Sequence, residues 1–177
     1  MPTTPPRHLV IFARAPRLGA VKRRLARDVG AHKALAFYRG QLFSLMRRLG
    51  GDPRWTPWLA ATPDRAAGRP GLWPPGFRLI GQGRGDLGAR MARVFRTLPP
   101  GPVVIVGSDI PGVTPAHIAD AFAALARAEA VIGPSTDGGY WLIGLRRRAP
   151  PPPGLFRGVR WSGPYAYADT RATLPRS

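Results

Sequence analysis

Asp109 follows the most apolar run of this chain, Val103 to Gly107, and only Ser108 separates the two. A run this apolar is typical of a strand covered on both faces of its sheet, and such sheets are usually parallel. In open α/β proteins, ligands bind at the carboxyl edge of the sheet, where Asp109 would lie. A carboxylate there could hold a hard cation such as Mg²⁺ or Mn²⁺ that bridges phosphate oxygens. Asp109 could equally cap a turn or the next helix, as aspartate often does.

Basic side chains follow another apolar run, residues 8–13, which we expect to form the first strand. Arg14 comes directly after it, and Lys22 and Arg24 open a helical segment beside a glycine loop. Guanidinium and ammonium groups bind phosphate oxygens, and helix N-termini attract anions. The commoner fate of such a charge run is a solvated helix face. In a parallel sheet these cations would face Asp109 across one edge, which suits a nucleotide with a divalent metal.

The turn formed by Asp137, Gly138 and Gly139 is followed by Tyr140 and Trp141. Asp-Gly-Gly is first of all a tight turn between strands, where glycine supplies a positive φ. Glycines would also let a second substrate approach the backbone closely, and the two aromatic rings could stack on that substrate. Asp137 is the one carboxylate of this loop and therefore the candidate general base for an acceptor hydroxyl.

Asp86 lies in the glycine loop GQGRGDLG (81–88) and would gather at the same edge of the sheet. This loop resembles the dinucleotide pattern G-x-G-x-x-G, but it lies in the middle of the chain rather than after the first strand. The sequence contains no P-loop, no G-x-S-x-G nucleophile elbow and no paired-histidine metal motif. It also has no cysteine, which excludes disulfides and thiolate metal sites.

Hydrophobic periodicity alternates between strands and helices along the chain. We expect strands at 8–13, 55–62, 77–82, 102–107, 130–134 and 141–145. We expect helices from Lys22 onward, at 31–50, after the glycine loop to 98, at 114–128, and near the C-terminus. Pro57 suits an edge strand or a strand start, whereas Thr114 and Pro115 suit a helix N-cap and first helical position. The alternation predicts one domain over 1–177, a three-layer α/β/α sandwich with a mostly parallel sheet.

The formal charge of +18 invites a nucleic-acid interpretation. Nearly all the basic residues are arginine, and they are scattered rather than gathered into one arm, so the pattern does not favour a nucleic-acid partner. A field this positive should still attract phosphorylated ligands. The sequence has no apolar run near the roughly 20 residues of a membrane span and no secretory signal pattern, so we expect a cytoplasmic protein without a membrane partner. The oligomeric state stays open.

Five segments of the chain resemble one bacterial family. They are IFARAPRLGAVKRRLA (11–26), QGRGDLGARM (82–91), GSDIPGVTPAHI (107–118), GPSTDGGYWLIGL (133–145) and VRWSGP (159–164). The family is DUF2064, also called the radical-SAM/selenodomain-associated transferase family, which has a glycosyltransferase type A fold and is placed among nucleotide-diphospho-sugar transferases. The chain is also similar to phospholactate guanylyltransferases, which share a lysine-x-arginine-leucine element after the first strand.

The resemblance assigns roles residue by residue. The family's K-T-R-L reads Lys22-Arg23-Arg24-Leu25 here, which implies a phosphate role for Lys22 and Arg24. The G-S-D-x-P-x-x-T-P element matches 107–115, so Gly107 and Ser108 would line the nucleotide site and Asp109 would be the metal-holding carboxylate.

Other elements match in full or in part. D-G-G-Y is intact, Q-G-G-G-D-L-G departs at Arg84 but keeps Asp86, and W-S-T-P reads Trp161-Ser162-Gly163-Pro164. The D-x-D pair of many glycosyltransferases is absent, since 108–110 offers one carboxylate.

The resemblance implies a metal-assisted glycosyltransferase that takes a nucleotide sugar and a small-molecule acceptor. Neutralisation of the diphosphate leaving group would be mostly electrostatic catalysis. The alternatives are a nucleotidyltransferase, guanylyltransferase-like, that uses a nucleoside triphosphate and a small phosphorylated acceptor, and a non-catalytic nucleotide-binding module.

Overall fold

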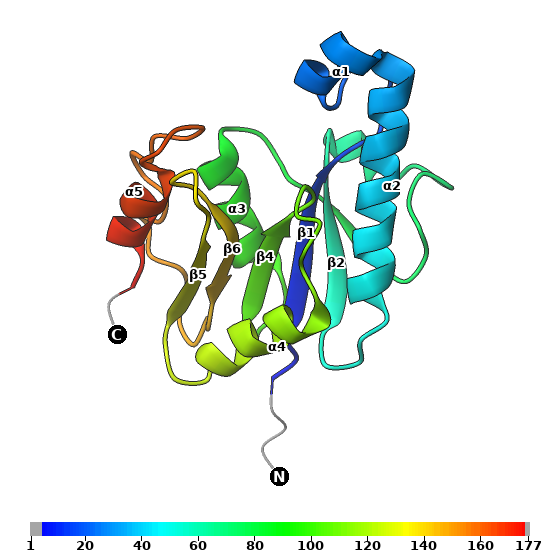
Figure 1. The fold of residues 1–177 in the computed structure, drawn as a ribbon. Helices are drawn as coiled ribbons and strands as arrows, with labels where there is room; N and C mark the ends of the chain where they lie inside the picture. Colours follow the sequence, from blue (N-terminus) through cyan, green and yellow to red (C-terminus); the bar gives the residue numbers. More distant parts are fainter. Residues whose placement is uncertain (1–4, 176–177) are drawn as a thin grey trace.

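The structure is a computed structural model that describes residues 5–175 (Figure 1). Its central element is a six-stranded sheet. The strands are β1 (His8–Arg14), β2 (Thr56–Thr62), β3 (Arg78–Gly81), β4 (Val103–Gly107), β5 (Ala130–Pro134) and β6 (Tyr140–Leu145). The helices are α1 (Arg23–Val29), α2 (Ala31–Gly50), α3 (Leu87–Thr97), α4 (Pro115–Ala124) and α5 (Ala166–Thr173), with a 3₁₀ turn, η1 (Asp64–Ala66).

The strand order is β3-β2-β1-β4-β6-β5. β3, β2, β1 and β4 pair in parallel, whereas β6 runs antiparallel to both β4 and β5. β5 therefore points the same way as β4, and the hairpin turn after it reaches the carboxyl edge of the parallel strands. The mostly parallel sheet is confirmed, and the loops after β1, β3, β4 and β5 share that edge.

Helices cover both faces of the sheet, which confirms the three-layer α/β/α sandwich (Figure 1). On one face, α2 and α4 pack on the sheet through buried side chains that include Leu42, Met46, Ile118 and Phe122. On the other face, α3 packs through Met91 and Phe95, together with Phe156 from the segment before α5. Residues 8–13 of β1 are all buried because both layers cover them. Side chains of β1 can therefore reach solvent or a ligand only where the strand ends, at Arg14.

β2 lies between β3 and β1, so the edge-strand option predicted for Thr56–Thr62 is wrong. The other option, a strand start, is what the structure has. Pro57 is the second residue of the strand, where β2 begins to pair with β1. A missing N–H is tolerated there because the ladder is only starting.

The helix that follows the Asp109 loop begins as the sequence predicts. Thr114 is the N-cap of α4, its side chain accepts a hydrogen bond from the His117 N–H, and Pro115 is the first helical residue. The imidazole of His117 accepts in return from the Thr114 N–H, which completes a capping box. This double cap determines where the chain turns back into a helix after leaving the site.

Candidate functional site

An open cleft of about 670 Å³ lies at the carboxyl edge of the sheet. It spans from the ends of β2 and β3, past β1 and β4, to the β5–β6 turn. Its lining residues are Phe12, Ala13, Arg14, Thr62, Gln82, Leu87, Arg90, Gly107, Ser108, Asp109, Ile110, Pro111, Ser135, Asp137, Tyr140 and Trp141. The cleft thus brings together residues from all four segments singled out in the sequence: the end of the first strand, the glycine loop, the Asp109 loop and the Asp137 turn.

Lys22 and Asp109 meet directly, although 86 positions lie between them in the chain. The ammonium Nζ of Lys22 is 3.1 Å from Oδ2 of Asp109, and their side chains are 26% and 54% exposed. Lys22 is held in the left-handed conformation (φ 49°) where α1 begins, and its ammonium also lies 5.9 Å from the centre of the Phe37 ring. A cation and a carboxylate therefore face each other at the sheet edge, as the loop order predicts.

Tyr38 on α2 joins the β1 and β4 strand ends, a role that its place in the helical apolar pattern does not reveal. Its hydroxyl accepts from the Arg14 N–H, donates to the Arg14 carbonyl at 2.8 Å, and lies 3.5 Å from Ser108 Oγ. Burial raises the pKa of Tyr38, so the phenol stays protonated and keeps its donor. Tyr38 thereby holds the backbone of Arg14 in place and contacts Ser108, the residue before Asp109.

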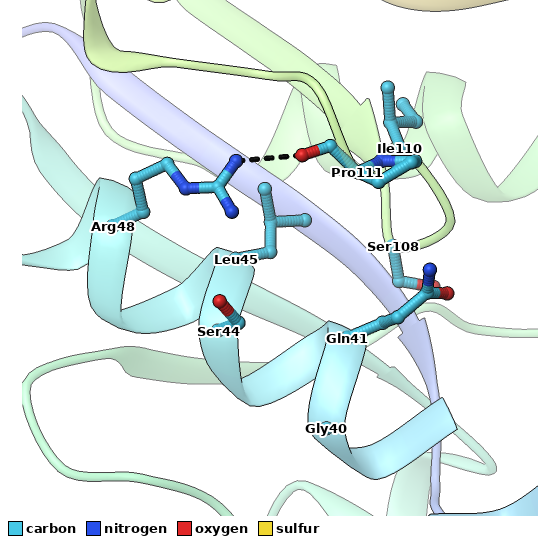
Figure 2. A pocket seen from close by; sticks show the side chains of 8 residues that line it. All are labelled: Gly40, Gln41, Ser44, Leu45, Arg48, Ser108, Ile110 and Pro111. Carbon is cyan, nitrogen blue, oxygen red and sulfur yellow. Dashed lines mark hydrogen bonds between the residues drawn. The ribbon is translucent and has the colours of Figure 1, made fainter. Parts of the chain in front are cut away.

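The loop after β4 is tied to α2 by Arg48 (Figure 2). The guanidinium of Arg48 donates to the carbonyl oxygens of Pro111 at 2.9 Å and of Val113 at 2.7 Å. A small pocket of about 250 Å³ lies between α2 and this loop, with Ser108 and Ile110 on its loop side. The Asp109 loop is thus fixed from behind, which limits how far its carboxylate can move.

Asp137 closes its own turn. Its Oδ1 accepts from the Ser135 hydroxyl and from the Gly139 N–H. The Ser135 hydrogen bond, followed by that of Gly139, lowers the pKa of Asp137 below its ordinary value. The carboxylate stabilises the turn and is also exposed in the cleft, where an acceptor hydroxyl could reach it. The turn role is therefore compatible with the role of a general base, which stays a prediction.

Gly138 has a packing reason for lacking a side chain. Its φ is +81°, and a Cβ there would lie 2.3 Å from the backbone oxygen of Pro164. Its carbonyl accepts from the Tyr167 N–H at 2.9 Å. The close approach at Gly138 is thus made by the segment before α5, whereas Gly139 and Tyr140 line a cavity beside the turn. A substrate contact at Gly138 and Gly139 stays a prediction.

Gly138→Ala is expected to lower the free energy of unfolding by about 2 kcal/mol, because a left-handed backbone costs an alanine about 1–2 kcal/mol and the clash adds to it. Gly71→Ala is the matched control, since Gly71 has φ +69° and open space around it. Urea unfolding of the two variants measures the difference. Equal losses would mean that the turn accommodates the methyl group and that packing against Pro164 contributes nothing.

Five predicted site residues do not line this cleft: Lys22, Arg24, Asp86, Gly138 and Gly139. Lys22 contacts the cleft residue Asp109, and the two glycines belong to the Asp137 turn. Asp86 is the N-cap of α3, and its Oδ1 accepts from the Ala89 N–H at 2.8 Å. Arg24 is exposed on α1. The geometry gives Asp86 a structural contact, and nucleotide binding by either residue stays a prediction.

Gln82 and Arg90 line the cleft but were not singled out as site residues from the sequence. The Gln82 amide donates to the carbonyls of Ala60 at 2.8 Å and Ala13 at 3.3 Å, which ties β3 to its neighbours. Arg90 donates from Nε to the Gly85 carbonyl at 2.9 Å. Both lie within QGRGDLGARM (82–91), a segment that resembles the family. This resemblance was the one feature of the sequence that could have identified them as site residues.

Metal ligands are sparse in this site. Within residues 5–175, no group of three or more His, Cys, Asp or Glu side chains is arranged to hold an ion. Mg²⁺ is usually bound by one or two carboxylates together with substrate phosphates and waters. Asp109, half-exposed at the strand edge, fits a cation that arrives with a diphosphate. In the same part of the chain, no helix is long and apolar enough to cross a membrane.

The fold is of the nucleotide-diphospho-sugar transferase type. The chain is similar to a crystal structure described as a "putative nucleotide-diphospho-sugar transferase" from Desulfovibrio desulfuricans G20, with 28% identity and a TM-score of 0.81. The match covers 94% of this chain and 74% of that one.

This chain belongs to the DUF2064 family, described as "Uncharacterized protein conserved in bacteria", whose model matches residues 45–163. The matched residues include Asp109 and Asp137 but not Arg14 and Lys22. A comparison with curated proteins finds no match.

Proposed function

We propose that this protein transfers a glycosyl group from a nucleotide-diphosphate sugar to a small-molecule acceptor with the help of Mg²⁺ or Mn²⁺. The observation that carries the proposal is the Lys22–Asp109 pair, which lies at the mouth of a cleft in a nucleotide-diphospho-sugar transferase fold. Opposite charges at one edge suit a diphosphate, because the ammonium binds its oxygens and the carboxylate faces a cation that neutralises them.

Different side chains along the cleft would bind the diphosphate and the cation. Arg14 and Arg90 line it near β1 and α3, and their positive charges would hold the diphosphate together with Lys22. The Lys22 ammonium has three donors, so it can keep Asp109 and still bind a phosphate oxygen. Asp109 would hold the cation, which would supply charge neutralisation on the leaving group. These positive charges favour the nucleoside diphosphate as it departs.

Asp137 is proposed as the group that receives the acceptor's proton. The bond between the anomeric carbon and the diphosphate oxygen breaks, the acceptor oxygen bonds to that carbon, and its proton passes to the carboxylate. A carboxylate whose pKa is lowered is a weak base, so it accepts the proton late, when the new bond has made the hydroxyl acidic. The turn hydrogen bonds hold Asp137 in place for this transfer.

A screen of nucleotides and nucleotide sugars, with and without Mn²⁺, tests the donor class. Ligand at about a hundred times its Kd adds about 2.7 kcal/mol of stability, so a true donor should raise Tm clearly. Turnover with the stabilising donor then separates the reactions: glycosyl transfer releases nucleoside diphosphate, and nucleotidyl transfer from a triphosphate releases pyrophosphate. Stabilisation without any product would support a non-catalytic nucleotide-binding module instead.

Asp137→Asn is expected to lower turnover in the presence of acceptor while leaving nucleotide affinity almost unchanged. The amide keeps an oxygen for the Gly139 N–H but cannot take a proton. Tm, nucleotide affinity and kcat should be measured on one preparation. A variant that is less stable yet fully active per folded molecule would restrict Asp137 to a turn role.

The pH profile gives a second readout for the same assignment. Because the pKa of Asp137 is lowered, the wild type should keep its turnover as pH falls, until the pH passes that lowered value. Ser135→Ala removes the main cause, raises the pKa toward its ordinary value, and should move the acid limb of kcat to higher pH. An acid limb that stays in place would show that another group controls turnover.

A further inference from the structure

A second cavity, of about 520 Å³, adjoins the cleft on the side of the β5–β6 turn. Leu87, Asp137 and Tyr140 line both spaces, so the two are continuous at these residues. The outer wall comes from the segment before α5, including Trp161 and Ser162. A molecule in this cavity would reach Asp137 from the side away from Lys22 and Arg14.

The charges around this cavity differ from those of the cleft. Asp137 is the one charged residue among those that line it, whereas Arg14 and Arg90 line the cleft. The neighbouring Arg160 is engaged elsewhere: its Nε is 2.9 Å from Asp169 Oδ2, and its guanidinium lies 3.9 Å from the centre of the Tyr165 ring. In a chain with 27 lysines and arginines, this cavity has no cation on its wall.

The walls of the cavity are aromatic and aliphatic. The Tyr140 and Trp161 rings meet edge to face, with centroids 6.5 Å apart. Leu87, at the start of α3, is 43% exposed and adds an aliphatic face to this wall. Such faces bind the apolar side of a ring, as rings bury large areas against aromatic side chains.

We propose that this cavity is the acceptor subsite and that it takes an uncharged, ring-bearing alcohol rather than a phosphorylated acceptor. A phosphate here would lie near the Asp137 carboxylate with no cation on the cavity wall to pair with, and like charges at short range repel. An alcohol on a neutral ring needs no cation and is not repelled by the carboxylate, and its hydroxyl can lie next to Asp137. The assignment rests on the proposed glycosyl transfer, and it favours that reaction over nucleotidyl transfer to a phosphorylated acceptor.

Calorimetric titration with phenyl β-D-glucoside and with its 6-phosphate tests the assignment on the full chain. The neutral glucoside is expected to bind at least about tenfold more tightly than the phosphate. Leu87→Lys places a cation on the cavity wall and should narrow or reverse that ratio. Leu79→Lys is the matched control: Leu79 is 39% exposed on β3, away from the cavity, and the wild-type preference should persist.

Several results would overturn the assignment. They are equal or tighter binding of the phosphate by the wild type, no binding of either probe at millimolar concentration, and a preference that Leu87→Lys leaves unchanged. Titration of nucleoside diphosphates into the same samples keeps the two proposals distinct. If nucleotides fail to bind while the probes behave as expected, the donor assignment is wrong, and the cavity remains a site for a neutral ring but not an acceptor subsite. The reverse pattern rejects the cavity assignment alone.

Discussion

Asp109→Asn is expected to lower turnover by about two to three orders of magnitude, the cost of losing one electrostatic group that stabilises developing charge. The amide is almost the same size as the carboxylate but holds neither a divalent cation nor Lys22 by charge. Stability should change little, because the pair is partly exposed and such ion pairs contribute about 0–1 kcal/mol. The loss should therefore appear in kcat and in the metal-dependent part of nucleotide binding, with the fold intact.

The control is Asp120→Asn, which changes an exposed aspartate on α4, a helix that begins with the double cap and lies away from the cleft. Kinetics with and without Mn²⁺, together with Tm, should be measured for both variants. If Asp109→Asn bound nucleotide and metal as well as wild type and turned over normally, the metal assignment of Asp109 would be wrong. A large fall in Tm would indicate that the carboxylate acts through the loop structure.

Lys22→Met is expected to weaken nucleoside diphosphate binding by about ten- to a hundredfold, because a hydrogen bond to a charged group is worth about 1.5–3 kcal/mol. Methionine keeps much of the length of the side chain without its charge, and it is no more strained than lysine at the left-handed backbone of residue 22. Binding of the unphosphorylated nucleoside should stay nearly the same. The split between the two ligands identifies a phosphate contact.

Lys33→Met is the matched control, because Lys33 is the other lysine of the chain and is exposed in the first turn of α2. Affinities should be measured by calorimetry at fixed ionic strength, since salt screens exposed charges. Equal weakening of nucleoside and diphosphate would mean that Lys22 acts through structure. An unchanged diphosphate affinity would move the phosphate role to Arg14 or Arg90, which line the cleft.

The order and type of most elements could be predicted from the sequence because their causes are local. The apolar run before Asp109 specifies a buried strand, and Thr114 with Pro115 specifies the start of α4. The alternation of strands and helices then leads to a three-layer sandwich with a mostly parallel sheet. That topology was enough to predict that the loops bearing Lys22 and Asp109 share one edge.

The tertiary structure decided what the loop residues contact, because those contacts join segments far apart in the chain. The Tyr38 hydroxyl is invisible in a helical apolar pattern until α2 packs beside the ends of β1 and β4. Pro57 could not reveal that β2 lies inside the sheet, since strand order depends on how crossovers pack.

The cavity beside Asp137 is the clearest case of a feature that local patterns cannot encode. Its walls come from α3, the β5–β6 turn and the segment that holds Trp161. The packing of Pro164 against Gly138 places these walls together, and Arg160, next to Trp161 in the chain, is paired with Asp169. Asp137 and Trp161 lie 24 residues apart in the sequence and line the same cavity only once the chain has folded. The sequence could therefore identify Asp137 and Tyr140 but not the cation-free space in front of them.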